Sequence, residues 1–188
     1  VEAAAALSEQ ITDTIHTLGM PHATFRIEVS SSDTFTAEGA DSVRFLFSAN
    51  LGQAPADVEK IASGGELSRV MLAVKYALAR RAKLPSILFD EIDTGVSGEI
   101  SDRMGSIMQD MSRHMQVIAI THLPQIASRG DLQYKVFKQE SEGTTLSRIA
   151  LLSPEERTAE LARMISGANI TEAAMGHARE LLRQNAKN

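Results

Sequence analysis

The sequence predicts an α/β fold in which a mostly parallel central sheet is flanked by helices, with a small antiparallel strand pair beside it. Apolar runs at residues 84–89 and 116–121 are typical of strands buried on both faces, and residues 100–111 between them have helical periodicity. A strand, a helix and a strand in this order form a right-handed crossover, which makes the two strands parallel. Alternating apolar residues at 25–29 and 43–47 predict the antiparallel pair, on either side of a polar connection.

Residues 2–18 predict an amphipathic helix. Gly19 and Pro21 provide its stop signal, and its apolar stripe consists of Leu7, Ile11, Ile15 and Leu18. A surface helix that packs on the core is the favoured interpretation. The alternative is that residues 1–19 are the end of a longer coiled-coil arm that enters the domain.

Residues 63–69 combine two glycines with the start of a predicted helix. The apolar positions of this helix follow at i, i+3, i+4 and i+7 spacing, and they are Leu67, Val70, Met71, Val74, Ala77 and Leu78. Glycines at a helix start leave backbone N–H groups open to an anion, where side chains would block the approach. Taken alone, the Ser-Gly-Gly pattern is better explained by a turn in which Ser63 caps the helix.

Two carboxylates directly follow the first strand of the predicted βαβ unit. These are Asp90 and Glu91, and the second strand of the unit ends at His122. Ligands of open α/β sheets lie beyond the carboxyl ends of the parallel strands, so we expect these three residues at one edge. Each has an ordinary structural interpretation as well, because acidic strand ends are often solvated and a lone histidine is often a satisfied structural side chain.

The remaining chain contains further predicted elements but no repeat or linker. Residues 94–98 predict a turn, and residues 132–139 and 144–152 predict a hairpin. A helix beginning with Ser-Pro-Glu-Glu occupies residues 153–167, with serine as its N-cap and glycine as its stop. Residues 172–185 predict the last helix.

Length and composition indicate one globular domain over residues 1–188. Hydrophobic residues make up 43% and charged residues 23%, which argues against wholesale disorder. No apolar run approaches the roughly 20 residues that span a bilayer, so we expect no membrane partner. The net charge of −5 gives no electrostatic footprint for nucleic acid, and the absence of cysteine excludes disulfides. Because the chain begins with Val1 and not Met, we expect it to be a piece of a longer protein.

Several motifs, in register, resemble one family of ATPases. Residues 62–69 resemble the signature loop of ABC-type ATPases, residues 87–91 resemble the Walker B strand, residues 94–98 resemble the D-loop, and His122 resembles the switch histidine. Residues 90–93, Asp-Glu-Ile-Asp, are similar to the SMC branch, which serves chromosome maintenance and repair. Within that branch, the motifs and the C-terminal tail most closely resemble the RecN family of bacterial DNA repair ATPases. This match covers most of the chain from residue 45 onward.

This resemblance implies an ATP site shared between two heads. Asp90 would hold Mg²⁺, Glu91 would orient or deprotonate the attacking water, and His122 would contact the γ-phosphate. A second set of residues would contact the ATP of the other subunit in an ATP-sandwiched homodimer. That set is Ser63, Gly64, Gly65, Glu66 and Asp93.

One part of such an ATP site is absent from the sequence. No Gly-x-x-x-x-Gly-Lys-Ser/Thr loop occurs in the 188 residues. The resemblance therefore implies that the chain is the C-terminal lobe of an ABC-type ATPase head, inactive alone, with an exposed sheet edge and the N-terminal lobe of the same protein as its partner. For the whole protein it implies DNA binding, a role in recombination and the SOS response to DNA damage, and a cytoplasmic, nucleoid-associated location.

Other functions are compatible with the same residues. The chain could belong to another SMC-like recombination ATPase, or it could be a non-catalytic module for head dimerisation. A metal nuclease is a third option, since Asp90, Glu91 and Asp93 lie together in the sequence. The Ser-Gly-Gly pattern and the histidine after the next strand favour the ATPase.

Overall fold

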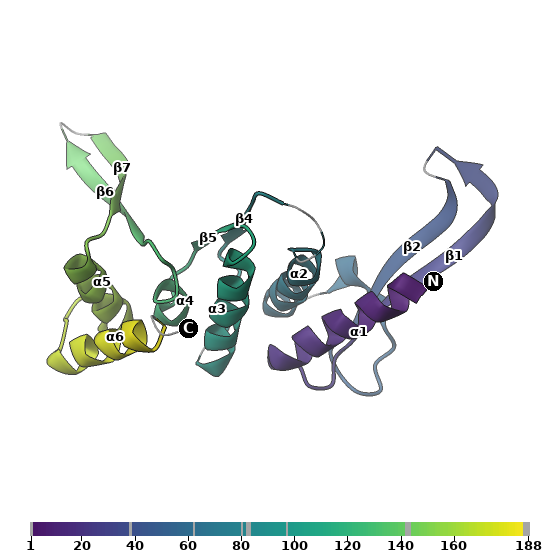
Figure 1. Ribbon diagram of the computed structural model, residues 1–188, viewed down its shortest axis with the longest axis horizontal. Helices are drawn as coiled ribbons and strands as arrows, with labels where there is room; N and C mark the ends of the chain where they lie inside the picture. The colour runs from purple at the N-terminus through teal and green to yellow at the C-terminus, as the bar shows by residue number, and fades with distance from the viewer. Residues whose placement is uncertain are drawn as a thin grey trace. The chain divides into compact units, whose positions relative to one another are not determined.

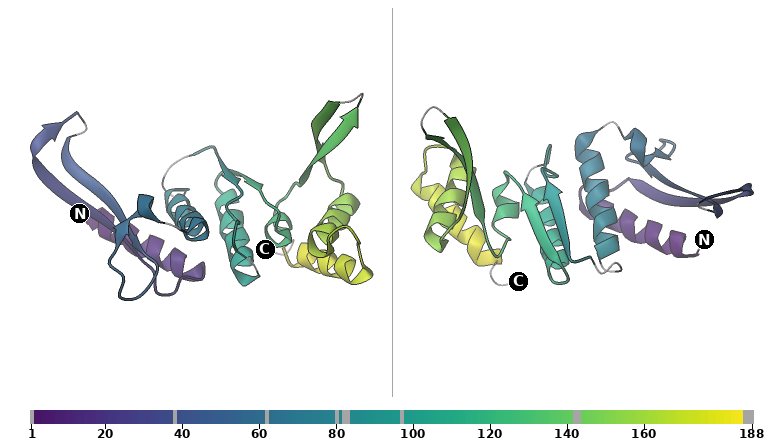
Figure 2. Two further views of the ribbon diagram at one scale, coloured as in Figure 1. Left: turned by 180° about the vertical axis from the view of Figure 1, so that it is seen from behind. Right: turned by 90° about the horizontal axis from the view of Figure 1, so that it is seen from above.

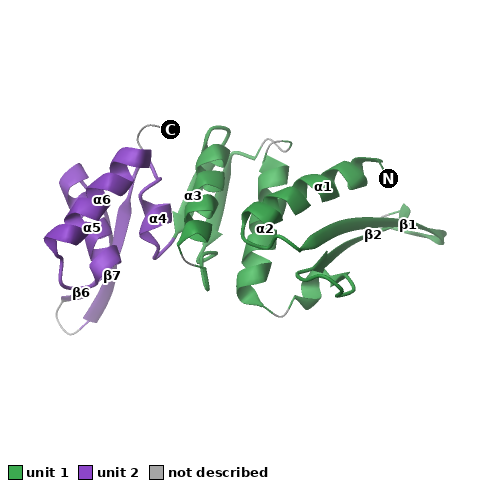
Figure 3. Cartoon of the chain, turned by 90° about the horizontal axis from the view of Figure 1, so that it is seen from below, with its two compact units in different colours: residues 1–120 green, residues 121–188 purple. Residues whose placement is uncertain are grey.

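A computed structural model of the protein describes residues 2–37, 39–61, 63–79, 81, 84–96, 98–141 and 144–185. Ala62 and Ser97 of the predicted motifs, and residues 142–143 of the predicted hairpin, lie outside the described residues. The chain divides into two compact units, residues 1–120 and residues 121–188 (Figure 3). Each unit has a hydrophobic cluster of its own. The expectation of a single lobe over residues 1–188 stays a prediction.

Helices and strands are mixed along the chain (Figure 1). The first unit contains α1 (Glu2–Thr17), β1 (Thr24–Thr36), β2 (Gly39–Ser48), β3 (Ala56–Asp57), the 3-10 turn η1 (Val58–Lys60), α2 (Gly64–Ala79), β4 (Ser86–Asp90), α3 (Glu99–Ser112) and β5 (Gln116–Ile120). The second unit contains α4 (Pro124–Ala127), β6 (Tyr134–Ser141), β7 (Thr144–Leu151), α5 (Pro154–Ser166) and α6 (Glu172–Asn185). Among the helices of the described ranges, none is long and apolar enough to cross a membrane.

The strands form three separate sheets. Strands β4 and β5 pair in parallel, and α3 connects them along the chain. This confirms the predicted βαβ unit. Strands β1, β2 and β3 form an antiparallel sheet, and β6 pairs with β7 in the predicted hairpin. The mixed α/β class is therefore confirmed. The parallel part, however, is limited to two strands, so the sheets of the described chain are not mostly parallel as we expected.

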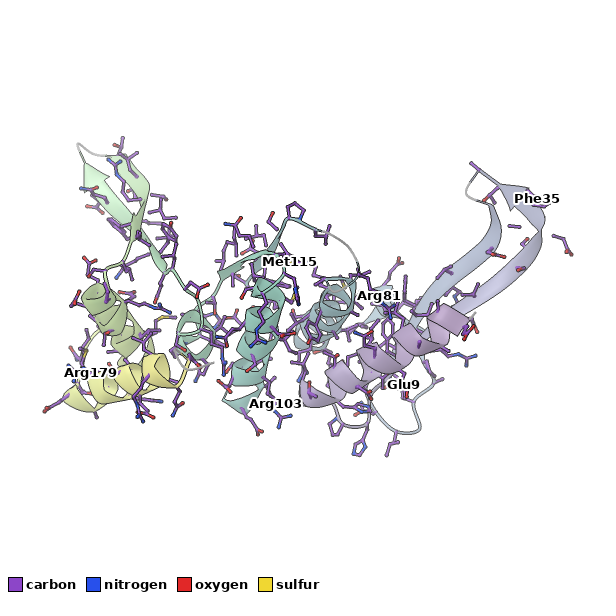
Figure 4. All side chains as sticks on the ribbon, in the orientation of Figure 1. Glu9, Phe35, Arg81, Arg103, Met115 and Arg179 are labelled. Carbon is purple, nitrogen blue, oxygen red and sulfur yellow. The ribbon has the colours of Figure 1, made fainter. Side chains whose placement is uncertain are left out.

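The β1–β2 hairpin is longer than the sequence predicted. We expected residues 30–41 to form a polar connection, but both strands continue through most of it, with a register shift between Ser31 and Thr36. Figure 2 shows this hairpin extending beyond the rest of the first unit. Its outer residues are exposed on both sides, and Phe35, labelled in Figure 4, is 83% exposed. Since neither face is buried there, the strands need no apolar alternation, which is the signal we relied on.

The main core of the first unit lies between α1, the base of the hairpin and α2. Ile11 and Ile15 of α1 are almost fully buried and cluster with Phe25 and Val70, which confirms the predicted apolar stripe. The Thr12 hydroxyl accepts a hydrogen bond from the Phe25 N–H at 3.2 Å and donates to the Phe25 carbonyl at 3.2 Å. Helix α1 therefore covers the outer edge of β1 with polar as well as apolar contacts.

Helix α2 buries a wider surface than the predicted stripe. Val70, Leu72 and Ala73 are fully buried, whereas Met71 and Leu78, which we placed on the apolar face, are partly exposed. The physical reason is that α2 packs against both α1 and α3, so a single stripe does not describe its buried surface.

One face of the β4–β5 sheet is open. We expected these strands to be buried on both faces, but Leu88, Ile118 and Ile120 are 53%, 47% and 51% exposed. Leu88 pairs with Ile118, and Asp90 pairs with Ile120, so these side chains share one face. The opposite face is better covered, since Phe89 is buried. The described chain supplies a covering layer on that side only.

The second unit is built on two C-terminal helices. Helix α5 begins with the predicted capping box, in which the Ser153 hydroxyl accepts from the Glu156 N–H at 3.2 Å and the Glu156 carboxylate accepts from the Ser153 N–H at 2.8 Å. Leu161 of α5 packs with Ala178 of α6 in the buried cluster. Strand β7 is exposed along its whole length.

Arg157 of α5 organises the segment after α4. Its guanidinium donates to the Ser128 carbonyl at 2.9 Å and also to the carbonyls of Ala127, Gly130 and Asp131. Burial lowers the pKa of the Arg157 guanidinium, and the nearby Asp131 carboxylate partly opposes that effect. The short helix α4, which the sequence did not predict, is thus held at its C-terminal end by α5.

Candidate functional site

The start of helix α2 is an open, capped helix terminus. The Ser63 carbonyl accepts from the Leu67 N–H at 3.0 Å, and its hydroxyl accepts from the Glu66 N–H at 3.4 Å. Ser63 is therefore the N-cap, and Gly64 and Gly65 occupy the first turn. A Cβ atom built on Gly64 would meet nothing within 4 Å, so the backbone at Gly64 faces open space. Such a terminus exposes N–H groups that lack intrahelical acceptors.

The two glycines differ in their surroundings. A Cβ atom built on Gly65 would lie 3.4 Å from the Thr94 carbonyl oxygen and 4.0 Å from that of Gly95. The turn that follows β4 therefore packs directly against the start of α2. Two of the predicted motifs, residues 63–66 and residues 94–98, are brought together in the first unit.

The end of β4 presents two exposed carboxylates on a constrained backbone. Asp90 is the last residue of the strand, and Glu91 is in the left-handed region with φ of 47°. The Glu91 N–H donates to the Ile120 carbonyl at 3.1 Å, which ties it to the end of β5. Its carbonyl accepts from the Thr94 N–H at 3.3 Å and from the Thr94 hydroxyl at 2.9 Å. A glutamate held there costs about 1 kcal/mol or more, and such strain is concentrated at functional sites.

Asp93 lies inside the first unit and not on its surface. Its side chain is 0% exposed, and its carbonyl accepts from the Val96 N–H at 3.3 Å in the turn after β4. Burial of a carboxylate is costly unless polar groups surround it, so the turn after β4 must hold a defined conformation around Asp93. The role that the resemblance assigns to Asp93 across a dimer stays a prediction.

His122 belongs to the second unit. It is exposed and lies just beyond the end of β5, where the Thr121 hydroxyl accepts from the Leu123 N–H at 3.0 Å. This bond shapes the entry to α4, which begins at Pro124. The expectation that His122 lies beside Asp90 and Glu91 stays a prediction.

The carboxylates fit a magnesium ion that arrives with a nucleotide. Among the residues of the described ranges, no group of three or more His, Asp or Glu side chains could hold a metal ion by itself. Magnesium in phosphoryl-transfer sites is commonly bound by one or two carboxylates together with phosphate oxygens. The exposed Asp90 carboxylate, at the carboxyl end of a parallel strand, suits that use.

Sequence reasoning missed one residue at the start of α2. The Arg69 side chain donates from Nε to the Gly65 carbonyl at 3.1 Å and from Nη1 to the Leu18 carbonyl at 3.3 Å. The spacing of Arg69 four residues after Gly65 was a signal for the first contact, because such residues are neighbours on a helix. The contact with Leu18, 51 residues away, had no local signal.

The fold is similar to that of solved SMC head domains. The structure resembles the crystal structure of the Smc head domain with a coiled coil and joint from Pyrococcus yayanosii, with a TM-score of 0.63 and 23% identity over 84% of this chain and 28% of that chain. It also resembles the SMC head bound to the C-winged helix domain of ScpA, with a TM-score of 0.60 and 22% identity over 82% of this chain and 44% of that chain. These likenesses show the fold.

The sequence is similar to proteins named DNA repair protein RecN. The relative from Rickettsia conorii is 47% identical over 176 residues, 94% of this chain and 32% of its own length. The relative from Haemophilus influenzae is 39% identical over 182 residues, 96% of this chain and 33% of its own length. The chain therefore spans about a third of the length of these relatives. No protein-family model matches the chain.

Proposed function

We propose that this chain is the C-terminal half of the ATP-hydrolysing head of a DNA repair ATPase that acts on double-strand breaks and in recombination. The observation that carries the proposal is the Asp90–Glu91 pair at the carboxyl end of β4, with the Glu91 backbone held at a φ of 47°. The similarity to proteins named DNA repair protein RecN supports the process, and the SMC head fold supports the architecture.

In the proposed mechanism, Asp90 and Glu91 act on one nucleotide. Asp90 would hold a Mg²⁺ ion through a carboxylate oxygen, and the ion would neutralise charge on the transferring phosphoryl group. Glu91 orients the attacking water and accepts a proton from it. His122 donates toward the γ-phosphate from the segment that follows β5. The hydrogen bonds of the Glu91 backbone with Ile120 and Thr94 fix the point on the chain from which its side chain extends.

In the same proposal, the start of α2 acts on the nucleotide of a second copy of the protein. Gly64 and Gly65 present backbone N–H groups, Ser63 and Glu66 complete the polar turn, and the buried Asp93 supports the adjoining turn. Two heads then enclose two nucleotides as a homodimer. The packing of Gly65 against Thr94 and Gly95 supports a shared position for the two turns.

The proposal assigns the missing phosphate loop to an N-terminal lobe of the same longer protein. The open face of the β4–β5 sheet, with Leu88, Ile118 and Ile120, is a suitable surface for that lobe, since parallel sheets are normally covered on both sides. We further propose that this chain alone hydrolyses no ATP. DNA binding, the SOS response, a coiled-coil arm continuing α1 and a cytoplasmic, nucleoid-associated location belong to the whole protein.

Substitution of Glu91 in the longer protein tests the proposal. Glu91→Gln removes the base but retains shape, so we expect kcat for ATP hydrolysis to fall about 10²-fold or more while ATP binding persists. The matched control is Glu59→Gln, an exposed glutamate of η1. Hydrolysis by the Glu91→Gln protein at the wild-type rate would exclude the assigned role.

A further inference from the structure

The C-terminal end of helix α1 receives two arginine side chains from two different helices. Arg69 of α2 donates from Nη1 to the Leu18 carbonyl at 3.3 Å. Arg103 of α3 donates from Nη1 to the Thr17 carbonyl at 2.7 Å. Figure 4 labels Arg103 on α3, near the end of α1. The end of a helix carries unsatisfied carbonyls and a partial negative charge, so both contacts are favourable.

These arginines are not needed to terminate α1. Gly19 ends the helix by itself, with φ of 81° and an N–H that donates to the His16 carbonyl at 3.2 Å. Ile100 of α3 packs closely on it, because a Cβ atom on Gly19 would lie 2.3 Å from the Ile100 Cδ1 atom. The arginine contacts therefore add connections between helices beyond those that end α1.

The second contact of each arginine is with a residue at or near the turns of the candidate site. The Nε atom of Arg69 donates to the Gly65 carbonyl at 3.1 Å, within the first turn of α2. Arg103 pairs with Glu99 in the first turn of α3, directly after Gly98. Since the turns at Gly65 and Thr94 touch, the end of α1, the start of α2 and the turn after β4 form one connected cluster.

We propose that Arg69 is a positioning residue that fixes the start of α2 against the end of α1, with Arg103 as the second connection. The inference rests on the proposed function, in which the N–H groups of Gly64 and Gly65 meet the nucleotide of a second copy. A planar guanidinium reaches two carbonyls at once with defined geometry, and a lysine ammonium does not reproduce this bridge. Arg69 thus links the Gly65 carbonyl to the carbonyl at the end of α1.

Hydrogen exchange in the longer protein, without nucleotide, tests the connection directly. We expect Arg69→Lys and Arg69→Ala to raise the exchange rates of the Leu67 amide and the amides after it in the first turns of α2 about five- to tenfold. The matched control is Arg113→Ala, because Arg113 is exposed at the end of α3 and contacts only Asp110, at 3.7 Å, among the ion pairs of the described residues. Unchanged exchange in both Arg69 variants overturns the inference, whether or not the protein hydrolyses ATP.

Enzyme kinetics separate positioning from stability. We expect Arg69→Lys to keep the melting temperature close to that of the wild type yet lower kcat about tenfold, with KM for ATP changed less than twofold. Full recovery of both exchange and kcat by lysine overturns the inference, because a lone positive charge would then suffice. Failure of the proposed function has a different signature, namely unaltered ATP turnover in the Glu91→Gln protein.

Discussion

Two regions of the first unit use the same types of apolar residue in opposite ways. In the region of α1, the hairpin base and α2, the side chains of Ile15, Phe25 and Val70 are covered by elements of this chain. In the β4–β5 sheet, Leu88 and Ile118 are about half exposed. Among the described residues, the region that contains Gly64 and Gly65 therefore has a covered core, whereas one face of the sheet that ends in the two carboxylates is uncovered.

The largest expected effect of this difference is on nucleotide binding. We expect the isolated 188-residue chain to bind Mg-ATP no more tightly than about millimolar, a free energy of roughly 4 kcal/mol, and the longer protein to approach micromolar, roughly 8 kcal/mol. The chain has no phosphate loop, an exposed helix terminus contributes only about 1 kcal/mol, and Asp90 and Glu91 repel a triphosphate. Isothermal titration calorimetry measures the Mg-ATP affinity of the isolated chain and of the longer protein. Micromolar binding by the isolated chain would contradict the view that its ATP site is incomplete.

Stability should separate the two regions by several kcal/mol. Phe25→Ala leaves a cavity in a covered core and should lower the free energy of unfolding of this chain by about 3–5 kcal/mol. Leu88→Ala, on the open face, should lower it by about 1 kcal/mol or less, since that side chain already contacts water. Urea denaturation of the isolated chain measures both. If an N-terminal lobe covers this face in the longer protein, Leu88→Ala should lower the free energy of unfolding there by more. Equal losses of stability for Phe25→Ala and Leu88→Ala in the isolated chain would contradict the difference between the two regions.

Local patterns in the sequence predicted the type of nearly every long element. The stripe containing Ile11 and Ile15 and the Ser153 capping box are properties of neighbouring residues, so they are visible without a structure. The open face at Leu88 was mispredicted, because an apolar strand indicates that something covers it but not which polypeptide does so. The outer hairpin was missed because strands exposed on both sides leave no apolar alternation.

The candidate site was only partly visible for a related reason. The resemblance to ABC-type ATPases placed Asp90, Glu91 and Gly65 in one site, and the structure adds that Gly65 touches the turn at Thr94. The bridge from Arg69 to Leu18 joins residues 51 positions apart, so no local pattern could predict it. The left-handed Glu91 backbone also has no sequence signature, since glycine is the residue expected there.

The two glycines of the covered region allow a smaller and more specific comparison. Gly64→Val places a side chain in open space, so folding should be nearly unchanged while ATP-driven association of heads weakens tenfold or more, because phosphate approach is blocked. Gly65→Val should impair both folding and association, since the valine side chain would crowd the Thr94 carbonyl. Sedimentation with and without ATP, beside thermal denaturation, measures the two effects. Normal ATP-driven association of Gly64→Val heads would show that Gly64 and Gly65 do not contact the nucleotide of a second copy.

The smallest expected effect on stability lies at the end of the open sheet, in the Glu91 backbone. A glutamate at φ of 47° is strained by about 1–2 kcal/mol, and glycine relieves that strain at a cost of about 0.5–1 kcal/mol from its more flexible unfolded state. Glu91→Gly should therefore stabilise the protein by about 0.5–1 kcal/mol while abolishing ATP turnover. Glu91→Gln, which keeps the strained backbone, should lose turnover without gaining stability.

Urea denaturation of the two Glu91 variants, compared with wild type, separates the backbone from the side chain. Thr94 contacts the Glu91 carbonyl and Ile120 accepts from its N–H, so both substitutions leave these hydrogen bonds in place. A gain in the glycine variant alone would show that the protein keeps a carboxylate there against a conformational cost, as expected of a site selected for chemistry. Equal stability of the two variants would mean that this backbone stores no strain, and the geometric argument for Glu91 would then rest on its position beside Asp90 alone.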